Sequence, residues 1–226
     1  MDPAPAAPTT PRPPRRADQT RRRLLEAAVH LIRAKGYEAA TVDDLCREAG
    51  LTKGAFFHHF RGKEDLALAA ANHFAANAGQ LFAQAPYHAP TDPRDRVLGY
   101  VDFRRAILRG DLPEYTCLLG TMVQETYATH PALREACDAH ISEHAATVAQ
   151  DLEAARAQHA PTADWTAESL GLFTQAVLQG AFVLAKAKGG PEVADACLAH
   201  LRRYLELLFV SPVNAQPGVN DHDHAR

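Results

Sequence analysis

The chain has 226 residues, of which 46% are hydrophobic and 23% charged, a balance typical of a soluble globular protein with one large domain or two small ones. The start, Met1 to Pro5, has no signal-peptide pattern, and no run reaches the roughly 20 uncharged apolar residues that cross a bilayer, so we expect no membrane partner. The four cysteines form no Cys-x-x-Cys pair, which disfavours a disulfide framework or a zinc cluster and fits the cytoplasm: Cys46, Cys117, Cys137 and Cys197.

The net charge of −3 is unevenly distributed along the chain. Residues 1–66 contain 12 Lys/Arg and 9 Asp/Glu, which gives +3, whereas residues 67–226 contain 12 and 18, which gives −6. A mildly basic front on an acidic body is typical of a small nucleic-acid-reading head on a larger body, although unrelated sequences often show such a split.

Both ends of the chain lack apolar periodicity and are predicted to be disordered. Residues 1–17 are rich in Pro, Ala, Thr and Arg, and form either a solvated tail or a basic arm that attracts phosphates. Residues 211–226 form the second tail, in which His222 and His224 are at most an adventitious metal site. We expect no functional metal.

Between the tails, apolar periodicity predicts helix after helix and no strands, so the fold class is all-α. Leu24, Ala28, Leu31 and Ile32 form one apolar stripe, and Gly36 is a natural C-terminal stop. The predicted helices cover residues 18–35, 42–49, 53–59, 63–84, 93–109, 113–128, 131–159, 164–188 and 191–209.

The most informative segment runs from residue 41 to residue 66, TVDDLCREAGLTKGAFFHHFRGKEDL. Thr41 is placed to cap a helix that Gly50 ends by accepting a left-handed conformation. Thr52 is placed to cap a second, very short helix after a tight turn. Two short helices joined by such a turn form a helix-turn-helix.

The second helix has the composition of a DNA-reading helix. Small and polar residues gather at its N-terminus, the end that approaches base edges, whereas Phe56 and Phe60 are predicted core anchors. Lysine and histidine side chains follow at positions that could reach phosphates. The alternative is a small helical core with incidental surface polarity. The candidate DNA-binding residues are Thr41, Thr52, Lys53, Gly54, Ala55, Phe57, His58, His59 and Lys63.

Residues 20–66 resemble the TetR (AcrR-type) family of bacterial regulators almost position by position. The matching features are a Thr-Arg start, paired alanines, Gly-Tyr, Ala-Gly, Lys-Gly and Lys-Glu, namely Thr20, Arg21, Ala27, Ala28, Gly36, Tyr37, Thr41, Ala49, Gly50, Lys53, Gly54, Phe60, Lys63 and Glu64. The chain departs at Phe57, where the family usually has a tyrosine whose hydroxyl contacts a phosphate.

The resemblance implies a three-helix DNA-binding head at residues 18–66 and a helical ligand-binding and dimerisation body at residues 67–210. It also implies a two-fold dimer through the last two long helices, with half-sites about 34–36 Å apart on a palindromic operator. Small and apolar residues suit that interface but equally suit an intramolecular core: Ala176, Gly180, Ala181, Leu201, Leu205 and Leu208.

The resemblance further implies a ligand-responsive regulator, by family default a repressor, that releases DNA when a small-molecule effector binds the body. Each candidate effector-binding residue is equally open to a role in the core: Tyr100, Phe103, Cys117, Met122, His140, His144, Phe173 and Val177. The run YTCLLGTMVQE also resembles a branch of the family with cysteine-based electrophile sensors. A thiol in the first turn of a helix begun by Pro113 would be activated, whereas the alternative for Cys117 is an ordinary buried thiol.

Two other classes of protein are alternatives to a DNA-binding regulator. An enzyme is disfavoured because the sequence has no Ser/His/Asp or Cys/His arrangement, no Gly-rich phosphate loop and no metal-ligand cluster, so we expect no catalytic residues and no cofactor. A helical interaction protein without DNA binding remains open, and it would show no salt-dependent DNA affinity.

Overall fold

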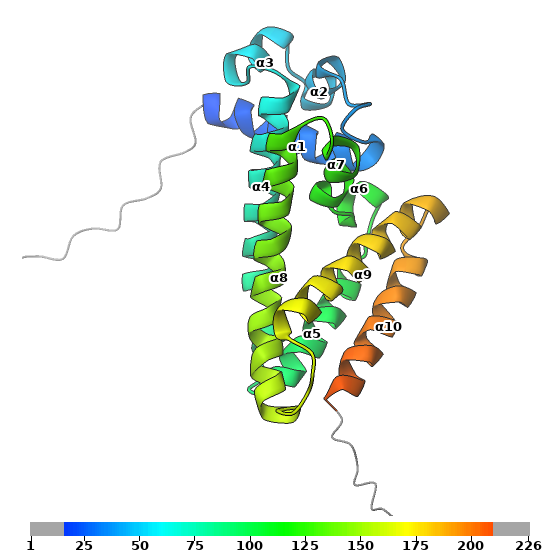
Figure 1. Ribbon diagram of the computed structural model, residues 1–226. Helices are drawn as coiled ribbons and strands as arrows, with labels where there is room; N and C mark the ends of the chain where they lie inside the picture. Colours follow the sequence, from blue (N-terminus) through cyan, green and yellow to red (C-terminus); the bar gives the residue numbers. More distant parts are fainter. Residues whose placement is uncertain (1–15, 210–226) are drawn as a thin grey trace, which may run out of the picture. The chain divides into compact units, whose positions relative to one another are not determined.

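The computed structural model describes residues 16–209, which form ten α-helices and one short 3-10 helix and contain no strand (Figure 1). The predicted all-α class is therefore confirmed. The described residues divide into two compact units, one made of residues 16–80 and 111–140 and the other of residues 81–110 and 141–209. The tails predicted at residues 1–17 and 211–226 lie almost entirely outside the described residues.

The first unit contains the N-terminal helices and a pair of short helices from the middle of the chain. It comprises α1 (Arg16–Lys35), α2 (Val42–Ala49), α3 (Lys53–His59), the larger part of α4 (Lys63–Ala83), α6 (Leu112–Tyr115), α7 (Leu118–Thr126) and the start of α8 (Pro131–His159). The second unit comprises the rest of α4 and α8, with η1 (Pro86–His88), α5 (Pro93–Ala106), α9 (Ala167–Lys188) and α10 (Glu192–Leu208). The domain boundary predicted at residue 66 stays a prediction.

In the first unit, α1 packs against α2, α3, α6 and α7. The stripe predicted on α1 faces this core, where Leu24, Ala28 and Ile32 are almost completely buried. Phe56 of α3 and Phe60 behind it are buried as predicted. These apolar side chains fix where α2 and α3 sit on α1, because two helices of eight and seven residues would not be stable alone.

The helix predicted over residues 113–128 is wrong, because the structure has two helices, α6 and α7, with Thr116 and Cys117 extended between them. The carbonyl oxygens of Glu114 and Thr116 accept hydrogen bonds from Nη1 of Arg33 at 3.3 and 3.1 Å. The amide of Gly120 donates to Sγ of Cys117 at 3.4 Å. A side chain from α1 therefore uses carbonyls that a continuous helix would need.

In the second unit, α10 packs against α9 and α5, and η1 packs against α5. The buried side chains include Leu178 and Ala181 on α9 and Leu198 on α10. Ion pairs also link the helices: Arg105 to Asp195, Arg202 to Asp102 and Arg96 to Asp151, at 2.7, 2.9 and 2.7 Å. Apolar burial and the first two of these pairs hold α10 along α5 and α9, whereas the third pair joins α5 to α8.

The remaining helix boundaries differ from the prediction by a few residues. α5 ends at Ala106 and not at residue 109. α9 begins at Ala167 because Thr166 caps it by accepting a hydrogen bond from the amide of Ser169 at 3.1 Å. The short helix η1 was not predicted from the sequence.

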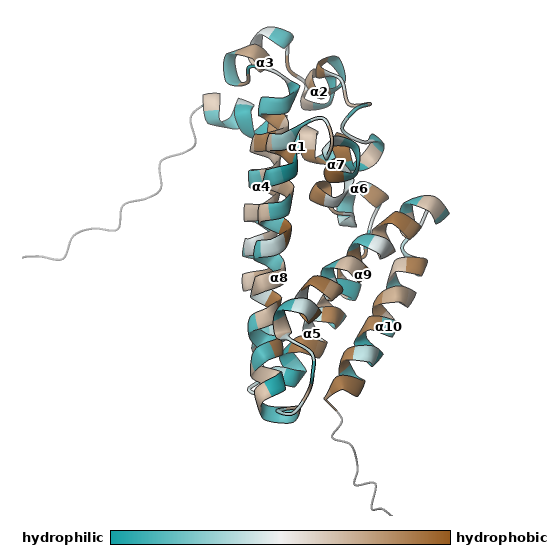
Figure 2. Cartoon of the chain, viewed as in Figure 1, coloured by the Kyte–Doolittle hydropathy of each residue, from teal (hydrophilic) through white to brown (hydrophobic). Residues whose placement is uncertain are grey.

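The helix α9 is the most apolar long helix and appears largely brown in Figure 2. By length and composition alone it could span a bilayer, with a mean hydropathy of 1.3, although a core helix of a soluble protein passes the same test. This finding qualifies the expectation from the sequence, which identified no such stretch.

Leu198 provides a test of the α5–α9–α10 packing, since its side chain has no exposed surface. Leu198→Ala should lower the free energy of unfolding by about 2–5 kcal/mol, because it removes buried methyl groups and leaves a cavity. Leu81→Ala, at a leucine that is 49% exposed, should cost much less. Urea unfolding monitored by circular dichroism checks both variants, and equal losses would contradict the packing.

Candidate nucleic-acid interface and effector site

The helix α2 begins with a complete capping box at Thr41. Oγ1 of Thr41 accepts a hydrogen bond from the amide of Asp44 at 3.1 Å, and Oδ2 of Asp44 accepts from the amide of Thr41 at 3.2 Å. The ammonium of Lys35 lies 2.6 Å from the same carboxylate. These hydrogen bonds, that from Lys35 first, hold the pKa of Asp44 well below its usual range. Thr41 is thus placed as the cap that orients α2.

The turn between α2 and α3 has the geometry of a helix-turn-helix. Gly50 adopts the predicted left-handed conformation, with φ of 60°, and its amide donates to carbonyls in the last turn of α2. Thr52 caps α3 by accepting a hydrogen bond from the amide of Ala55 at 3.2 Å. The N-terminus of α3 is therefore fixed by the turn and its cap.

The helix α3 presents most of the predicted DNA-binding residues to solvent. Thr52, Lys53, Gly54 and His58 are exposed, and Phe57 is 56% exposed, whereas Phe56 faces the core. The face of α3 that points away from α1 is therefore free to approach a macromolecule.

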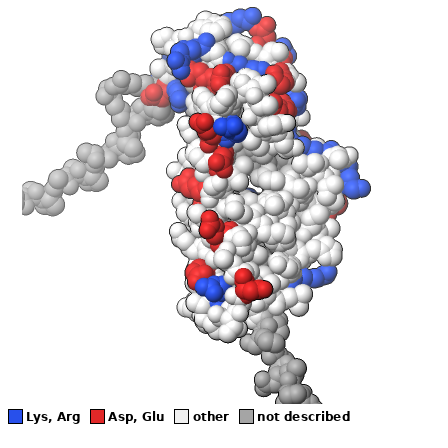
Figure 3. All heavy atoms as spheres, viewed as in Figure 1, with Lys and Arg blue, Asp and Glu red and all other residues white. Residues whose placement is uncertain are grey.

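The charges on this part of the chain are mixed, as the blue and red spheres near α1–α3 show in Figure 3. Lys53 pairs with Asp43 at 2.7 Å, but both side chains are largely exposed, so the pair is weak and a phosphate can compete for the ammonium. Ala55 is half-buried. His59 is also half-buried, and burial lowers its pKa, so its ring is neutral near pH 7.

Lys63 has contacts that the sequence did not predict. Its Nζ donates to the carbonyl oxygens of Tyr37 and Glu38 at 3.1 and 3.4 Å and lies 4.2 Å from the centre of the Tyr37 ring. The lysine therefore ties the start of α4 to the segment that joins α1 and α2. Its contact with a DNA phosphate stays a prediction.

The segment between α1 and α2 is also held by Glu125 of α7. Oε2 of Glu125 accepts a hydrogen bond from the amide of Glu38 at 2.8 Å. Gly36 has φ of 91°, and a Cβ there would clash with the Glu125 carboxylate. Together with Arg33, this contact fastens the three-helix head to α6 and α7, and sequence reasoning missed it because it joins residues 87 positions apart.

Three of the predicted effector-binding residues lie together in the second unit. Oη of Tyr100 is 3.0 Å from Nε2 of His144. Phe103 and Tyr100 are both near Phe82, with ring centres 5.6 and 5.9 Å apart from it. The sequence therefore predicted part of a real cluster, in which Tyr100 is buried and the other two predicted residues are half-buried.

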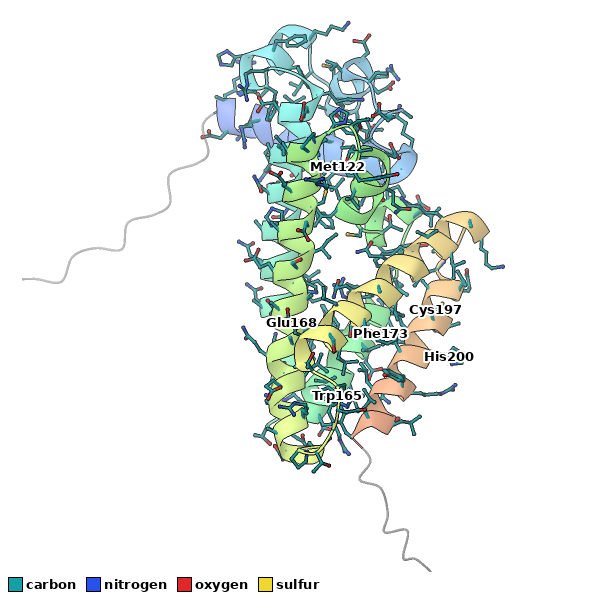
Figure 4. All side chains as sticks on the ribbon, viewed as in Figure 1. Met122, Trp165, Glu168, Phe173, Cys197 and His200 are labelled. Carbon is teal, nitrogen blue, oxygen red and sulfur yellow. The ribbon has the colours of Figure 1, made fainter. Side chains whose placement is uncertain are left out.

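The other candidates lie elsewhere. Cys117, Met122 and His140 belong to the first unit, where Met122 is fully buried and His140 bonds to Asn72 at 2.7 Å. Phe173, labelled on α9 in Figure 4, is 43% exposed and contacts Tyr204 of α10 with ring centres 5.3 Å apart. Three of these four therefore belong to a different unit from the Tyr100 cluster, and Phe173 contacts Tyr204 instead.

Val177 is half-buried on α9. Cys117 was expected in the first turn of a helix begun by Pro113. The structure corrects this expectation, because Cys117 is the N-cap residue of α7. All four cysteines are free thiols. Among the described residues, no group of three His, Cys, Asp or Glu is arranged to hold a metal ion.

Sequence reasoning missed four residues of the Tyr100 cluster: Phe82, Tyr87, Arg104 and Gln175. Arg104 follows Tyr100 by one helical turn, so the i, i+4 spacing was an available signal for it. Phe82, at the end of α4, and Gln175, on α9, are brought in by tertiary packing alone.

Comparison with known proteins agrees with this description. The family model for bacterial regulatory proteins of the tetR family matches residues 24–70, and that for the LmrA/YxaF-like C-terminal domain of transcriptional regulators matches residues 93–200. The chain is 29% identical over 126 residues to the regulator LmrA of Bacillus subtilis, covering 52% of this chain and 63% of LmrA. It is 42% identical over 64 residues to the repressor AcnR of Corynebacterium diphtheriae, covering 28% of this chain and 34% of AcnR.

Among solved structures, the chain is similar to the regulatory protein TetR from Rhodobacter sphaeroides, with a TM-score of 0.74 and 25% identity over 84% of this chain and 99% of that one. The alignments with LmrA and AcnR span less than two thirds of either protein. Fold and matches together define an all-helical helix-turn-helix protein with a C-terminal regulator domain. The chain belongs to the TetR family, which consists of transcriptional regulators and not of enzymes.

Substitutions at Lys63 and Lys53 compare a lysine that stabilises the fold with a lysine that is exposed. Lys63→Met should lower the free energy of unfolding by about 1–3 kcal/mol, because it removes charged hydrogen bonds and a cation–π contact at a side chain only 25% exposed. Lys53→Met should leave the urea midpoint unchanged, because its ion pair is exposed. If Lys63→Met unfolds like the unmodified protein, its contacts with Tyr37 and Glu38 carry no stability.

Proposed function

We propose that the chain is a ligand-responsive transcriptional repressor that binds a palindromic operator as a homodimer and releases it when an effector binds the body. The observation that carries the proposal is α3, a short helix capped by Thr52 whose outward face exposes Lys53, Phe57 and His58. A helix so placed in a helix-turn-helix enters the major groove N-terminus first. The repressor name of AcnR supports repression.

Within this proposal, the residues of α3 and its cap have two different roles in binding DNA. Thr52, Gly54 and Ala55 lie at the N-terminal end, where small side chains let the helix approach base edges. A Cβ at Gly54 would meet only Oγ1 of Thr52, at 3.7 Å, so the surface there is open. Lys53 and His58 supply contacts to phosphates, which orient the head without reading sequence.

The dimer is supported by an exposed apolar face on the last two helices, which we call the α9–α10 face. Its large apolar side chains are 43–69% exposed: Leu172, Phe173, Val183 and Leu184 on α9, and Tyr204 and Leu207 on α10. Ala176 and Gly180 lie exposed among them, whereas Ala181, Leu201 and Leu205 are buried within the chain. In Figure 3 the area over these helices is mostly white. A second copy would cover this face.

The cytoplasm is the proposed location, which the four free thiols support. Cys117 is proposed to act as a capping and packing residue of α7, since its sulfur already accepts the amide of Gly120. The operator would be released when the effector binds better to a conformation with lower DNA affinity.

Dimerisation through the α9–α10 face can be tested by adding a charge to it. Val183→Glu should make the protein monomeric at micromolar concentration in sedimentation velocity, because a carboxylate would be buried in an apolar interface. Leu81→Glu, at an exposed leucine outside this face, is the matched control and should stay dimeric. A monomeric unmodified protein, or a dimeric Val183→Glu variant, would refute this interface.

DNA binding through α3 can be tested by its salt dependence. Lys53→Ala should weaken binding to any duplex and reduce the slope of log K against log salt by about one unit, because one phosphate contact is lost. Arg109→Ala removes an exposed positive charge from the second unit and should leave the slope unchanged. Fluorescence anisotropy with a labelled duplex at several salt concentrations measures both slopes. An unmodified protein with no salt-dependent affinity would instead indicate a helical interaction protein.

A further inference from the structure

Arg104 of α5 lies among aromatic rings in the second unit. Its guanidinium carbon is 4.1 Å from the centre of the Phe82 ring and 5.3 Å from that of Tyr100. Tyr87 and Phe103 are adjacent to the same rings, with centres 5.7 Å from Tyr100 and 5.6 Å from Phe82 respectively. The arginine therefore places a positive charge among largely apolar, aromatic side chains, most of which are buried.

Arg104 differs from the other half-buried arginines of this unit in having no acidic partner. Each of the others has a carboxylate oxygen within 4 Å, in the pairs Arg94–Asp95, Arg96–Asp151, Arg105–Asp195, Arg156–Glu153 and Arg202–Asp102. Arg104 forms no ion pair with any residue between 16 and 209. A half-buried charge is stabilised when a counter-charge reaches it, and residues 16–209 supply none to Arg104.

The hydrogen bonds around Arg104 contain more donors than acceptors. Nε of Arg104 donates to Oη of Tyr100 at 3.0 Å, and Nε2 of Gln175 donates to the same oxygen at 3.3 Å. Nη2 of Arg104 lies 2.7 Å from Nε2 of His144, which is also 3.0 Å from Oη of Tyr100.

His144 cannot balance this arrangement. Burial, together with the nearby Arg104 charge, lowers the pKa of His144 to about 3, so its ring is neutral and Nε2 offers a single lone pair. The hydroxyl hydrogen of Tyr100 and an N–H of Arg104 compete for that lone pair. Nη1 of Arg104 donates to no side chain or carbonyl in the described part of the chain. The open side of the guanidinium is therefore available to an acceptor from a ligand.

We propose that the effector is an organic acid with an aromatic or similarly apolar body, whose carboxylate binds the guanidinium of Arg104 while its body packs on the half-buried ring of Phe103. A carboxylate matches the two parallel N–H groups of an arginine, and its charge supplies the missing partner. The aromatic surroundings favour an organic anion over a strongly hydrated inorganic one.

This inference rests on the proposed function, since it names the chemical class of the effector of the same regulator. The test therefore measures binding without DNA. If organic acids fail to bind but the protein still binds DNA with a salt-dependent affinity, the effector class is wrong and the function stands. If organic acids bind but the protein binds no DNA, the ligand class is right and the proposed function is wrong.

Isothermal titration calorimetry with matched probes tests the proposal on the full-length protein. The acids are benzoate, phenylacetate, cinnamate and salicylate, each at about 1 mM, and their amides are the uncharged controls of nearly equal shape. At least one acid should bind, and its amide should bind at least about tenfold more weakly, because a charged hydrogen-bonded pair is lost. No binding by any of the four acids, or equal binding of acid and amide, would overturn the proposal.

Variants assign the binding to Arg104. Arg104→Met should abolish the preference for the acid, and Arg104→Lys should retain part of it, because lysine keeps the charge but not the planar pair of donors. Arg109→Met, which removes an exposed charge just beyond the same helix, should bind like the unmodified protein. Circular dichroism verifies that each variant is folded. Full acid preference in a folded Arg104→Met variant would overturn the assignment, and Arg104→Lys keeps the test open should Arg104→Met fail to fold.

Discussion

The position of the helix-turn-helix depends on a carboxylate that comes from a distant part of the sequence. The carboxylate of Glu125 on α7 accepts a hydrogen bond from the amide of Glu38, and the absence of a Cβ at Gly36 leaves room for it. Arg33 makes the complementary contact, from α1 to the carbonyls between α6 and α7. Because α2 and α3 are too short to be stable alone, their orientation follows from how α1 and its following turn are held. The compact unit accordingly joins residues 16–80 with residues 111–140.

A second constraint is the way the chain distributes its charges. Exposed ion pairs on the three-helix head, such as that of Lys53 with Asp43, are weak, so water or a phosphate can readily replace one of the two partners. In the second unit, half-buried pairs such as Arg105 with Asp195 fasten helices to one another, and Arg104 alone among the half-buried arginines there has no acidic partner. Arginine therefore stabilises the packing of helices at position 105, whereas at position 104 its charge is available to bind a ligand.

Sequence reasoning predicted the local parts of this structure well. The caps at Thr41 and Thr52, the left-handed Gly50 and the buried Phe56 and Phe60 depend on residues within a few positions of one another, which a sequence displays directly. These features establish the helix-turn-helix.

Features that depend on tertiary contacts were not predicted. The break between α6 and α7 requires Arg33, which lies more than 80 positions away, and local composition favoured one continuous helix. Phe173 was predicted among the effector-binding residues, yet the side of α9 that faces solvent is decided by tertiary packing, including that against α10. Tyr100 and His144 were predicted, but Arg104 was overlooked because charge alone does not reveal whether a partner is near.

The central claim is that two copies of this chain read DNA through α3, and selection of bound sequences from a pool of random duplexes tests it most directly. The account predicts enrichment of an inverted repeat whose half-sites are centred about one helical turn, or a multiple of it, apart, since a two-fold dimer places its two reading helices in successive major grooves. A pool that stays random after repeated rounds with the purified protein, or that converges on one asymmetric site without repetition, would contradict the account.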